Sequence, residues 1–146
     1  MPAIKGTYAL ILALDTETAI KAGRLAPFSF PEGYYLYAGS ALGGLHSRIK
    51  RHIRDNKKPH WHIDYLRQEA RIIEVWYLDS CVRLECAWYQ YAVRLPHAQA
   101  VLAGFGSSDC GCYSHLVYFP SAPSFRDFRR QMGDEQGQNL KKMSIS

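Results

Sequence analysis

The sequence predicts a small α/β domain in which strands and helices surround one hydrophobic core. Hydrophobic residues make up 47% of the chain and charged residues 21%, which is a globular composition. Strand-like apolar runs alternate with segments whose apolar residues recur at helical spacing. The 146 residues suffice for one domain, which we expect to cover residues 1–132, with a polar, flexible tail at residues 133–146.

The first part of the chain holds two predicted strands separated by a turn-rich insertion. Residues 6–14, "GTYALILAL", are almost continuously apolar, as in a buried central strand. Residues 34–39, "YYLYAG", form the second strand. Residues 19–33 combine short apolar stretches with glycines and prolines, which predicts a small hairpin or an irregular excursion between the two strands.

Helices and strands alternate along the rest of the chain. Leu45, Ile49 and Ile53 recur every four positions and predict an amphipathic helix that continues to about residue 55. The other predicted elements are helices at residues 58–68 and 82–95, strands at residues 70–78 and 113–119, and one or two helical turns after Pro123. No repeat of fixed period and no low-complexity linker divides the chain.

The net charge of +5 is concentrated in one segment, residues 46–58. A basic patch on a neutral background is the electrostatic footprint that a polyphosphate partner requires, although a solvated helix face is the ordinary alternative. The candidate nucleic-acid-binding residues in and before this segment are Gly39, Ser40, Lys50, Arg51, Arg54, Lys57 and Lys58.

The glycine-rich turn at residues 39–44 matches neither common nucleotide-binding fingerprint. It lacks the lysine of a P-loop, and its glycines do not have the Gly-x-Gly-x-x-Gly spacing of a dinucleotide site. Gly39 instead fits a position where the backbone approaches a ligand closely or takes positive φ.

Two tyrosines lie at strand ends beside the basic helix. If the strands pair antiparallel, Tyr8 and Tyr37 flank one pocket, although strand tyrosines are commonly explained by packing alone. Arg48 adds a planar fork that matches phosphate oxygens. Phosphodiester cleavage needs a group that orients or deprotonates water, a cation for the developing charge, and a metal or acid for the leaving oxygen. A neighbouring arginine and a divalent metal favour ionised tyrosine.

These motifs resemble the GIY-YIG nucleases. "GTY" at residues 6–8 is similar to the first signature, and "YAGS" at residues 37–40 is similar to the second. "LHSRIKRH" resembles the arginine helix of that family, with Arg48 at the arginine position, and "LEC" places Glu85 at the metal-binding glutamate. The resemblance covers roughly residues 6–95, and the whole pattern is most similar to a branch of short single-domain members known as a domain of unknown function.

The resemblance implies a mainly three-stranded antiparallel sheet flanked by helices, with an inserted hairpin between the two signature strands. It also implies hydrolysis of DNA phosphodiesters, for example in DNA repair or processing, with Mg²⁺ or Mn²⁺ as cofactor. Tyr8 would activate water, Tyr37 would position water or phosphate, Arg48 would stabilise charge and Glu85 would hold the metal. Family members often take target recognition from a separate domain or protein partner.

A non-catalytic nucleic-acid-binding module with the same fold is the alternative function. The gap between the two signatures, residues 9–36, is long for the family, and the family's late asparagine has no clear equivalent. A binding module, however, would not need Tyr8, Tyr37, Arg48 and Glu85 together.

The histidines are further candidates. His52 follows Arg48 by four residues, shares its helix face, and is a candidate phosphate contact or proton donor. In "HWHID", a capping or surface role and a catalytic or metal-binding role are both open. The weaker site candidates are His60, His62, Asp109 and His115.

The N-terminal segment lacks the features of an export signal or a membrane span, so we expect a cytoplasmic protein that contacts no membrane. Reduced thiols are then expected for Cys81, Cys86, Cys110 and Cys112. Cys110 and Cys112 with His115 invite a zinc hypothesis, but Cys-x-Cys is not the usual knuckle spacing and a structural zinc is not expected.

Overall fold

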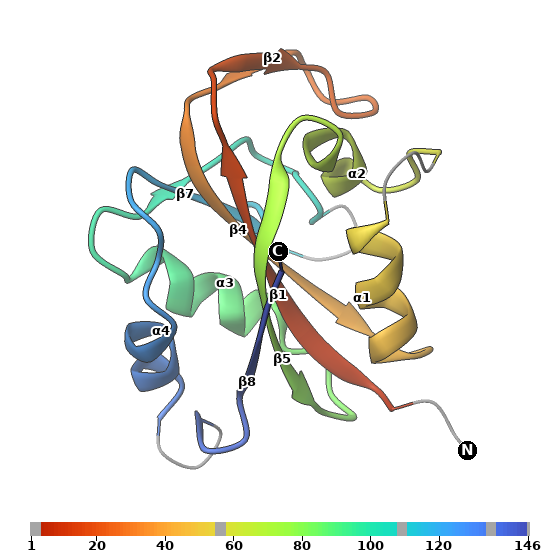
Figure 1. Ribbon diagram of the computed structural model, residues 1–146, viewed down its shortest axis with the longest axis vertical. Helices are drawn as coiled ribbons and strands as arrows, with labels where there is room; N and C mark the ends of the chain where they lie inside the picture. Colours follow the sequence, from red (N-terminus) through yellow and green to blue (C-terminus); the bar gives the residue numbers. More distant parts are fainter. Residues whose placement is uncertain (1–3, 55–57, 108–110, 134–136, 146) are drawn as a thin grey trace.

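The computed structural model describes residues 4–54, 58–107, 111–133 and 137–145 (Figure 1). The strands are β1 (Gly6–Leu14), β2 (Thr18–Ile20), β3 (Phe28–Phe30), β4 (Gly33–Ala41), β5 (Arg71–Asp79), β6 (Gln99–Ala100), β7 (Leu116–Phe119) and β8 (Lys141–Ser144). The helices are α1 (Leu45–Ile53), α2 (His62–Arg67), α3 (Glu85–Val93) and α4 (Phe125–Met132). No helix within these described stretches is long and apolar enough to cross a membrane.

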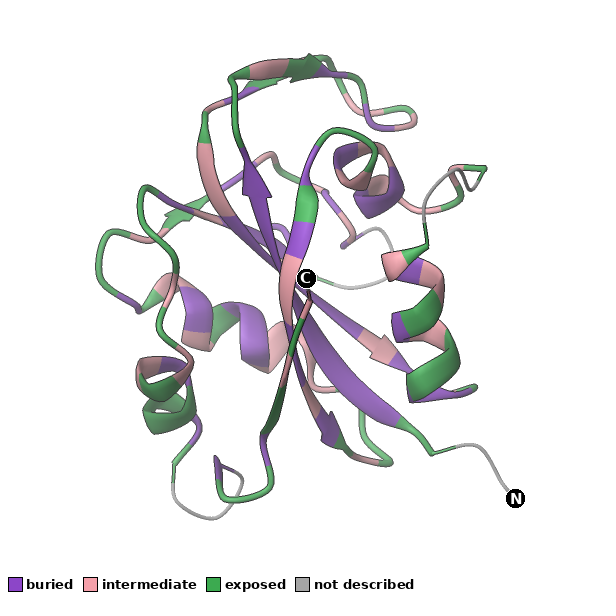
Figure 2. Cartoon of the chain, viewed as in Figure 1, coloured by how far each residue is buried: buried purple, intermediate pink, exposed green. Residues whose placement is uncertain are grey.

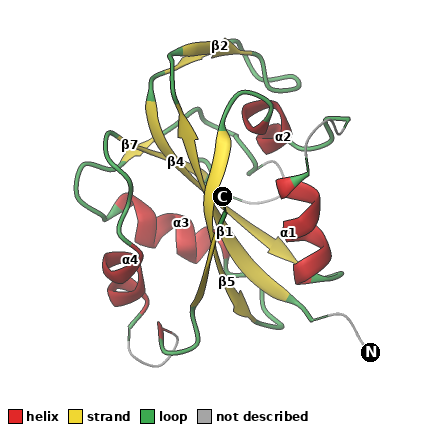
Figure 3. Ribbon diagram, viewed as in Figure 1, coloured by secondary structure: helices red, strands yellow, loops and turns green. Residues whose placement is uncertain are grey.

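A six-stranded antiparallel sheet in the order β6-β7-β4-β1-β5-β8 organises the fold (Figure 3). Its centre is β1, whose residues are all buried, as Figure 2 shows. The predicted antiparallel sheet is therefore confirmed: β4, β1 and β5 form its middle, and three shorter strands extend it on both sides.

The sheet separates two hydrophobic layers. Helices α1 and α2 lie on one side of the sheet and α3 and α4 on the other (Figure 1). Side chains alternate along a strand, so Leu10 and Leu12 of β1 face the first layer, whereas Ala9 and Ile11 face the second. Both layers contain buried aromatic side chains, and Trp88 of α3 is fully buried in the second layer. Helices from different parts of the chain thus cover opposite faces of one sheet.

The insertion between the two signature strands is a hairpin, as the glycines and prolines predict. Strands β2 and β3 pair antiparallel in a sheet of their own, outside the main sheet (Figure 1). Phe30 of β3 is fully buried and packs edge-on against Tyr35 and Phe105. The hairpin is therefore anchored to the α1 and α2 layer by its second strand.

The expectation of a flexible tail at residues 133–146 is wrong for its last part. Lys141–Ser144 forms β8, which pairs with β5 in a register that runs from Tyr77 opposite Lys141 to Glu74 opposite Ser144. Leu140 just before it is buried. Lysines on an edge strand look like a solvated tail in sequence, although charged residues are a common way to protect a sheet edge.

The predicted helix at residues 58–68 is shorter than expected. Helix α2 begins at His62, because Trp61 has an extended backbone conformation and occupies the N-cap position. His60 and Asp64 therefore do not share a helix face; they meet instead across the start of the helix.

Candidate functional site

A cavity of about 330 Å³ opens where β1 and β4 meet α1 and the first turn of α3. Tyr8, Tyr37, Arg48 and Glu85 all line it. Tyr8 pairs with Gly39 and Leu10 with Tyr37, so the antiparallel register brings both tyrosines to the same face of the sheet. The other lining residues are Gly39, Ser40, Leu42, Gly43, Trp61, Arg83, Gly106 and His115. The four residues singled out by the sequence resemblance thus lie around one cavity.

Tyr8 is held at the cavity by His52 and Arg48. The Tyr8 hydroxyl and His52 Nε2 lie 2.7 Å apart in a buried hydrogen bond. Burial raises the pKa of Tyr8 to about 12, although the charge of Arg48 and a hydrogen bond from it act in the opposite direction. Tyr8 is therefore a neutral phenol near pH 7, with a hydrogen-bonded imidazole beside its oxygen.

Tyr37 lies next to Tyr8 in the same layer. Its ring packs edge-on against His52 and Phe105, with centroid distances of 6.5 and 6.1 Å. Burial first, and then the neighbouring Tyr8, raise the pKa of Tyr37 well above its ordinary value. Tyr37 consequently offers the cavity a protonated hydroxyl.

Two glycines make room for these tyrosine rings. A Cβ on Gly39 would lie 2.6 Å from Cζ and from the hydroxyl oxygen of Tyr8. A Cβ on Gly106, whose φ is +71°, would lie 2.7 Å from Cε1 of Tyr37. Gly39, interpreted from sequence as a ligand contact, is thus required by Tyr8. Gly106 was missed, because its neighbour Tyr37 lies far away in sequence.

Replacing Gly39 with alanine is expected to destabilise the protein by about 1–3 kcal/mol, because the new methyl group overlaps the buried Tyr8 ring. Gly43→Ala is the matched control, since a Cβ there has no atom within 4 Å. Urea denaturation measures both variants. Equal unfolding free energies for the two would contradict the proposed packing of Tyr8 over Gly39.

Arg48 is oriented by Trp61 and the β4 backbone. Its guanidinium lies 4.4 Å from the centroid of the Trp61 ring, and its Nη1 donates to the Ser40 carbonyl at 3.3 Å. Arg51 lies over the same ring at 4.2 Å. Trp61 was not among the predicted site residues, although it stands inside "HWHID". Cation–π contacts of this kind restrict the arginine fork before any ligand binds.

Arg51 makes an internal ion pair. Its Nη1 and Nη2 donate to the two carboxylate oxygens of Asp64 at 3.0 and 2.9 Å. Asp64 also accepts from the backbone amides of His60 and Trp61 at the start of α2. Burial opposes ionisation, but the hydrogen bonds from Arg51, Trp61 and His60 outweigh it and lower the pKa of Asp64. The capping role weighed for "HWHID" is confirmed for Asp64, and the charge of Arg51, a predicted nucleic-acid contact, is already paired.

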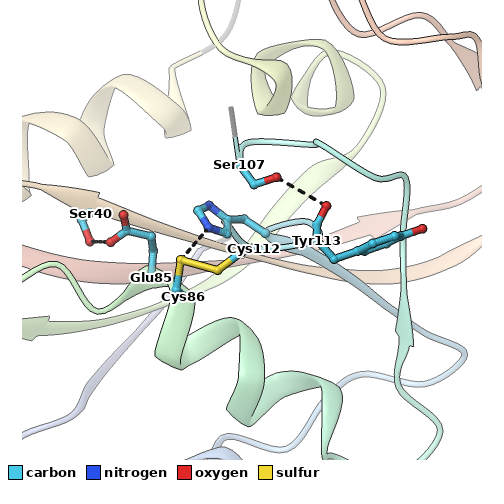
Figure 4. The surroundings of a disulfide bond; sticks show 7 residues. Ser40, Glu85, Cys86, Ser107, Cys112 and Tyr113 are labelled. Atoms are coloured by element: carbon cyan, nitrogen blue, oxygen red, sulfur yellow. Dashed lines mark hydrogen bonds between the residues drawn. A yellow bond between two sulfur atoms is a disulfide. The ribbon is translucent and has the colours of Figure 1, made fainter. Parts of the chain in front are cut away.

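Glu85 begins α3 and reaches the cavity from the opposite layer. The Ser40 hydroxyl donates to Glu85 Oε2 in a short hydrogen bond (Figure 4). Behind it, the hydroxyls of Ser40 and Thr7 lie 3.2 Å apart, and Thr7 accepts from the Leu84 amide at the same distance. This set of oxygen atoms, with one carboxylate, suits a hard cation such as Mg²⁺.

Cys86 and Cys112 are joined by a disulfide beside Glu85 (Figure 4). The expectation of reduced thiols is wrong for this pair, because the first turn of α3 meets the loop before β7 although the two cysteines are 26 residues apart. His115 of that loop places Nε2 3.5 Å from Cys86 Sγ. Burial lowers the pKa of His115. Cys81 is an exposed, free cysteine.

The other predicted site residues that the structure describes lie outside the cavity lining. Nδ1 of His62 accepts from the Gly106 amide at 2.9 Å and so fixes the loop beneath Tyr37. Burial lowers the pKa of His62. The side chains of Lys50, Arg54, Lys58 and His60 are exposed. Lys57, Asp109 and Cys110 lie outside the described residues.

The family of the chain follows from a match over most of its length. No curated protein and no solved structure matches it. A family model described as "Domain of unknown function DUF123" matches residues 7–137, which run from the start of β1 past α4 and include Tyr8, Tyr37, Arg48 and Glu85. The chain therefore belongs to the DUF123 family.

Proposed function

We propose that the protein is a divalent-metal-dependent endonuclease of the GIY-YIG type that hydrolyses DNA phosphodiester bonds. The observation that carries this proposal is the convergence of Tyr8, Tyr37, Arg48 and Glu85 on one cavity. These side chains supply two hydroxyl groups, a guanidinium and a carboxylate, which are the groups that phosphodiester cleavage uses.

Arg48 is the group that would stabilise charge on the phosphate. Its contacts with Trp61 and the Ser40 carbonyl leave it half-buried at the cavity wall. A planar guanidinium in a partly desolvated site interacts strongly with phosphate oxygens. A guanidinium that is already oriented loses little conformational entropy when the phosphate binds. Exposed Lys50 on the same helix is available for the flanking DNA backbone.

Tyr8 is the proposed water-activating group, and His52 is the proposed acceptor of its proton. With a pKa of about 12, Tyr8 is not a base near pH 7 unless its proton moves to a neighbour. His52 Nε2 at 2.7 Å is placed to receive that proton. Tyr37, which stays protonated, would orient the attacking water or a phosphate oxygen.

Glu85 is the residue that would hold Mg²⁺ or Mn²⁺. One carboxylate with hydroxyl oxygens around it fits the way Mg²⁺ binds proteins, where water and substrate oxygens complete the shell. A bound cation would neutralise negative charge on the phosphate.

The non-catalytic nucleic-acid-binding module remains the second candidate. Tyr8 and Glu85 are both engaged in hydrogen bonds within the protein, and the exposed basic side chains of α1 need no catalytic group to bind DNA. The two proposals differ in one measurable respect, which is metal-dependent cutting.

Incubation with branched, flapped, nicked and plain duplex DNA in Mg²⁺ or Mn²⁺ is the test. We expect cleavage by wild type, and a loss of roughly 10²-fold or more in Glu85→Gln, because a metal contribution is several kcal/mol. Glu69→Gln, an exposed glutamate after α2, is the matched control and should cut like wild type. DNA binding without cutting of any substrate would favour the binding module.

A further inference from the structure

We infer that Cys86, Cys112 and His115, in the dithiol state of the protein, form a binding site for a thiolate-preferring divalent cation such as Zn²⁺. The two sulfur atoms and one imidazole nitrogen all lie within 4.8 Å of one another. Thiolate and imidazole are the ligands that zinc takes most often in proteins. The site is separate from the oxygen donors of Glu85 and Ser40, which suit a hard cation.

The spacing of the donors fits one tetrahedral ion. With zinc–sulfur and zinc–nitrogen bonds of about 2.3 and 2.0 Å, a sulfur and a nitrogen on the same ion lie about 3.5 Å apart. Cys86 Sγ and His115 Nε2 are separated by 3.5 Å. No rearrangement of this pair is therefore required for both atoms to bind one cation.

The two sulfur atoms need to move only a short distance apart for both to bind the ion. Two sulfur ligands on a tetrahedral zinc lie about 3.8 Å apart, compared with about 2 Å in a disulfide. Rotation of the two side chains supplies a change of this size. Cys86 lies in the first turn of α3 and Cys112 in the loop before β7.

His115 is held as a metal-binding imidazole usually is. Its ring has a hydrogen bond with the Gly106 backbone, and its own amide and carbonyl bond to Phe105 and Ala38. A second contact of the ring fixes its orientation and strengthens it as a ligand. Within the described part of the chain these are three ligands, and a tetrahedral ion takes a fourth.

The disulfide and the metal site exclude one another, because both use the same sulfur atoms. A phosphine reductant opens the Cys86–Cys112 bond: the phosphine gains an oxygen from water, and the sulfurs take up two electrons and two protons as thiols. Binding of Zn²⁺ then releases the thiol protons. The disulfide and a bound metal ion would each link the first turn of α3, which carries Glu85, to the loop that carries His115. Glu85 and His115 both line the cavity.

Metal binding to the phosphine-reduced full chain, without oxygen or DNA, tests the site. We expect about one equivalent of Zn²⁺, and Co²⁺ should produce sulfur-to-cobalt charge-transfer absorption in the near ultraviolet. Cys86→Ser and Cys112→Ser should weaken Zn²⁺ binding by more than about 100-fold, because loss of an outer contact alone costs 10–100-fold. His115→Gln should weaken it and alter the cobalt spectrum.

Cys81→Ser is the matched control, since that exposed cysteine lies outside the cluster, and it should bind metal like wild type. Circular dichroism of each variant separates loss of ligand from loss of fold. Absence of zinc from the reduced wild type, or equal binding by folded Cys86→Ser and Cys112→Ser, would overturn the site and leave a disulfide alone. Because no DNA is present, this result is independent of the nuclease assay.

Discussion

Arg48→Ala is expected to lower DNA cleavage by about 10²–10³-fold, the usual effect of removing one group that stabilises transition-state charge. This effect is expected because the Arg48 guanidinium lies at the cavity between Tyr8 and Ser40 and is oriented by Trp61. Arg48→Lys should recover little of the activity, because an ammonium lacks the planar fork. Single-turnover cleavage rates measure both effects.

Lys50→Ala is the matched control for Arg48→Ala. Lys50 lies on the same helix but is exposed and does not line the cavity. Its loss should weaken DNA binding and reduce the salt dependence of binding, with the cleavage rate of bound DNA unchanged. If Arg48→Ala cut bound DNA at the wild-type rate, Arg48 would have no role in the chemical step.

Asp64→Ala is expected to lower the free energy of unfolding by about 2–4 kcal/mol, because the variant loses charge-assisted hydrogen bonds to the partly buried Arg51 and the cap of α2. The Asp64 side chain is 1% exposed and accepts hydrogen bonds from Nη1 and Nη2 of Arg51 and from two backbone amides of the α2 cap. Chemical denaturation followed by circular dichroism measures the change.

Asp127→Ala in α4 is the matched control for Asp64→Ala. Asp127 also occupies the first turn of a helix, but its pair with Arg130 is exposed and 4.0 Å long. An exposed pair of this kind contributes less than about 1 kcal/mol. Similar losses of unfolding free energy in the two variants would show that burial of the Asp64 carboxylate does not strengthen its contribution to stability.

The same carboxylate makes stability depend on pH. The pKa of Asp64 is lowered in the folded protein, so its contribution is fully present above the unfolded value of about 3.9 and is lost as pH falls through the folded value. Wild type should therefore lose more unfolding free energy on acidification than Asp64→Ala. Parallel denaturation curves across the acid range measure the difference.

The central strands and the helix of Arg48 were predictable because local patterns specify them. Continuous apolar runs indicated β1 and β4, and apolar residues that recur every four positions indicated α1. Antiparallel pairing then places Tyr8 and Tyr37 on one face without further information. Trp61 and Gly106 contact the site from a cap and a loop, whose positions depend on packing across the whole chain.

The sulfur pair and the last strand escaped prediction for different reasons. Cys86 and Cys112 meet because α3 packs against β4 and β7, which are neighbours in the sheet. Residues 141–144 are too polar to stand out as a strand, and they become one because β5 offers them an open edge. The disulfide and the strand both depend on contacts with residues far away in the sequence, so the local sequence does not indicate either of them.

The division of the cavity between the two layers has a consequence for how the proposed nuclease activity would be lost. Tyr8, Tyr37 and Arg48 belong to the layer of α1 and α2, whereas Glu85 is carried by α3 on the other face of the sheet. Proteins open in parts before they unfold as a whole. An opening that releases α3 alone would remove the carboxylate and spare the tyrosines, so inactivation is expected to precede melting of the central strands.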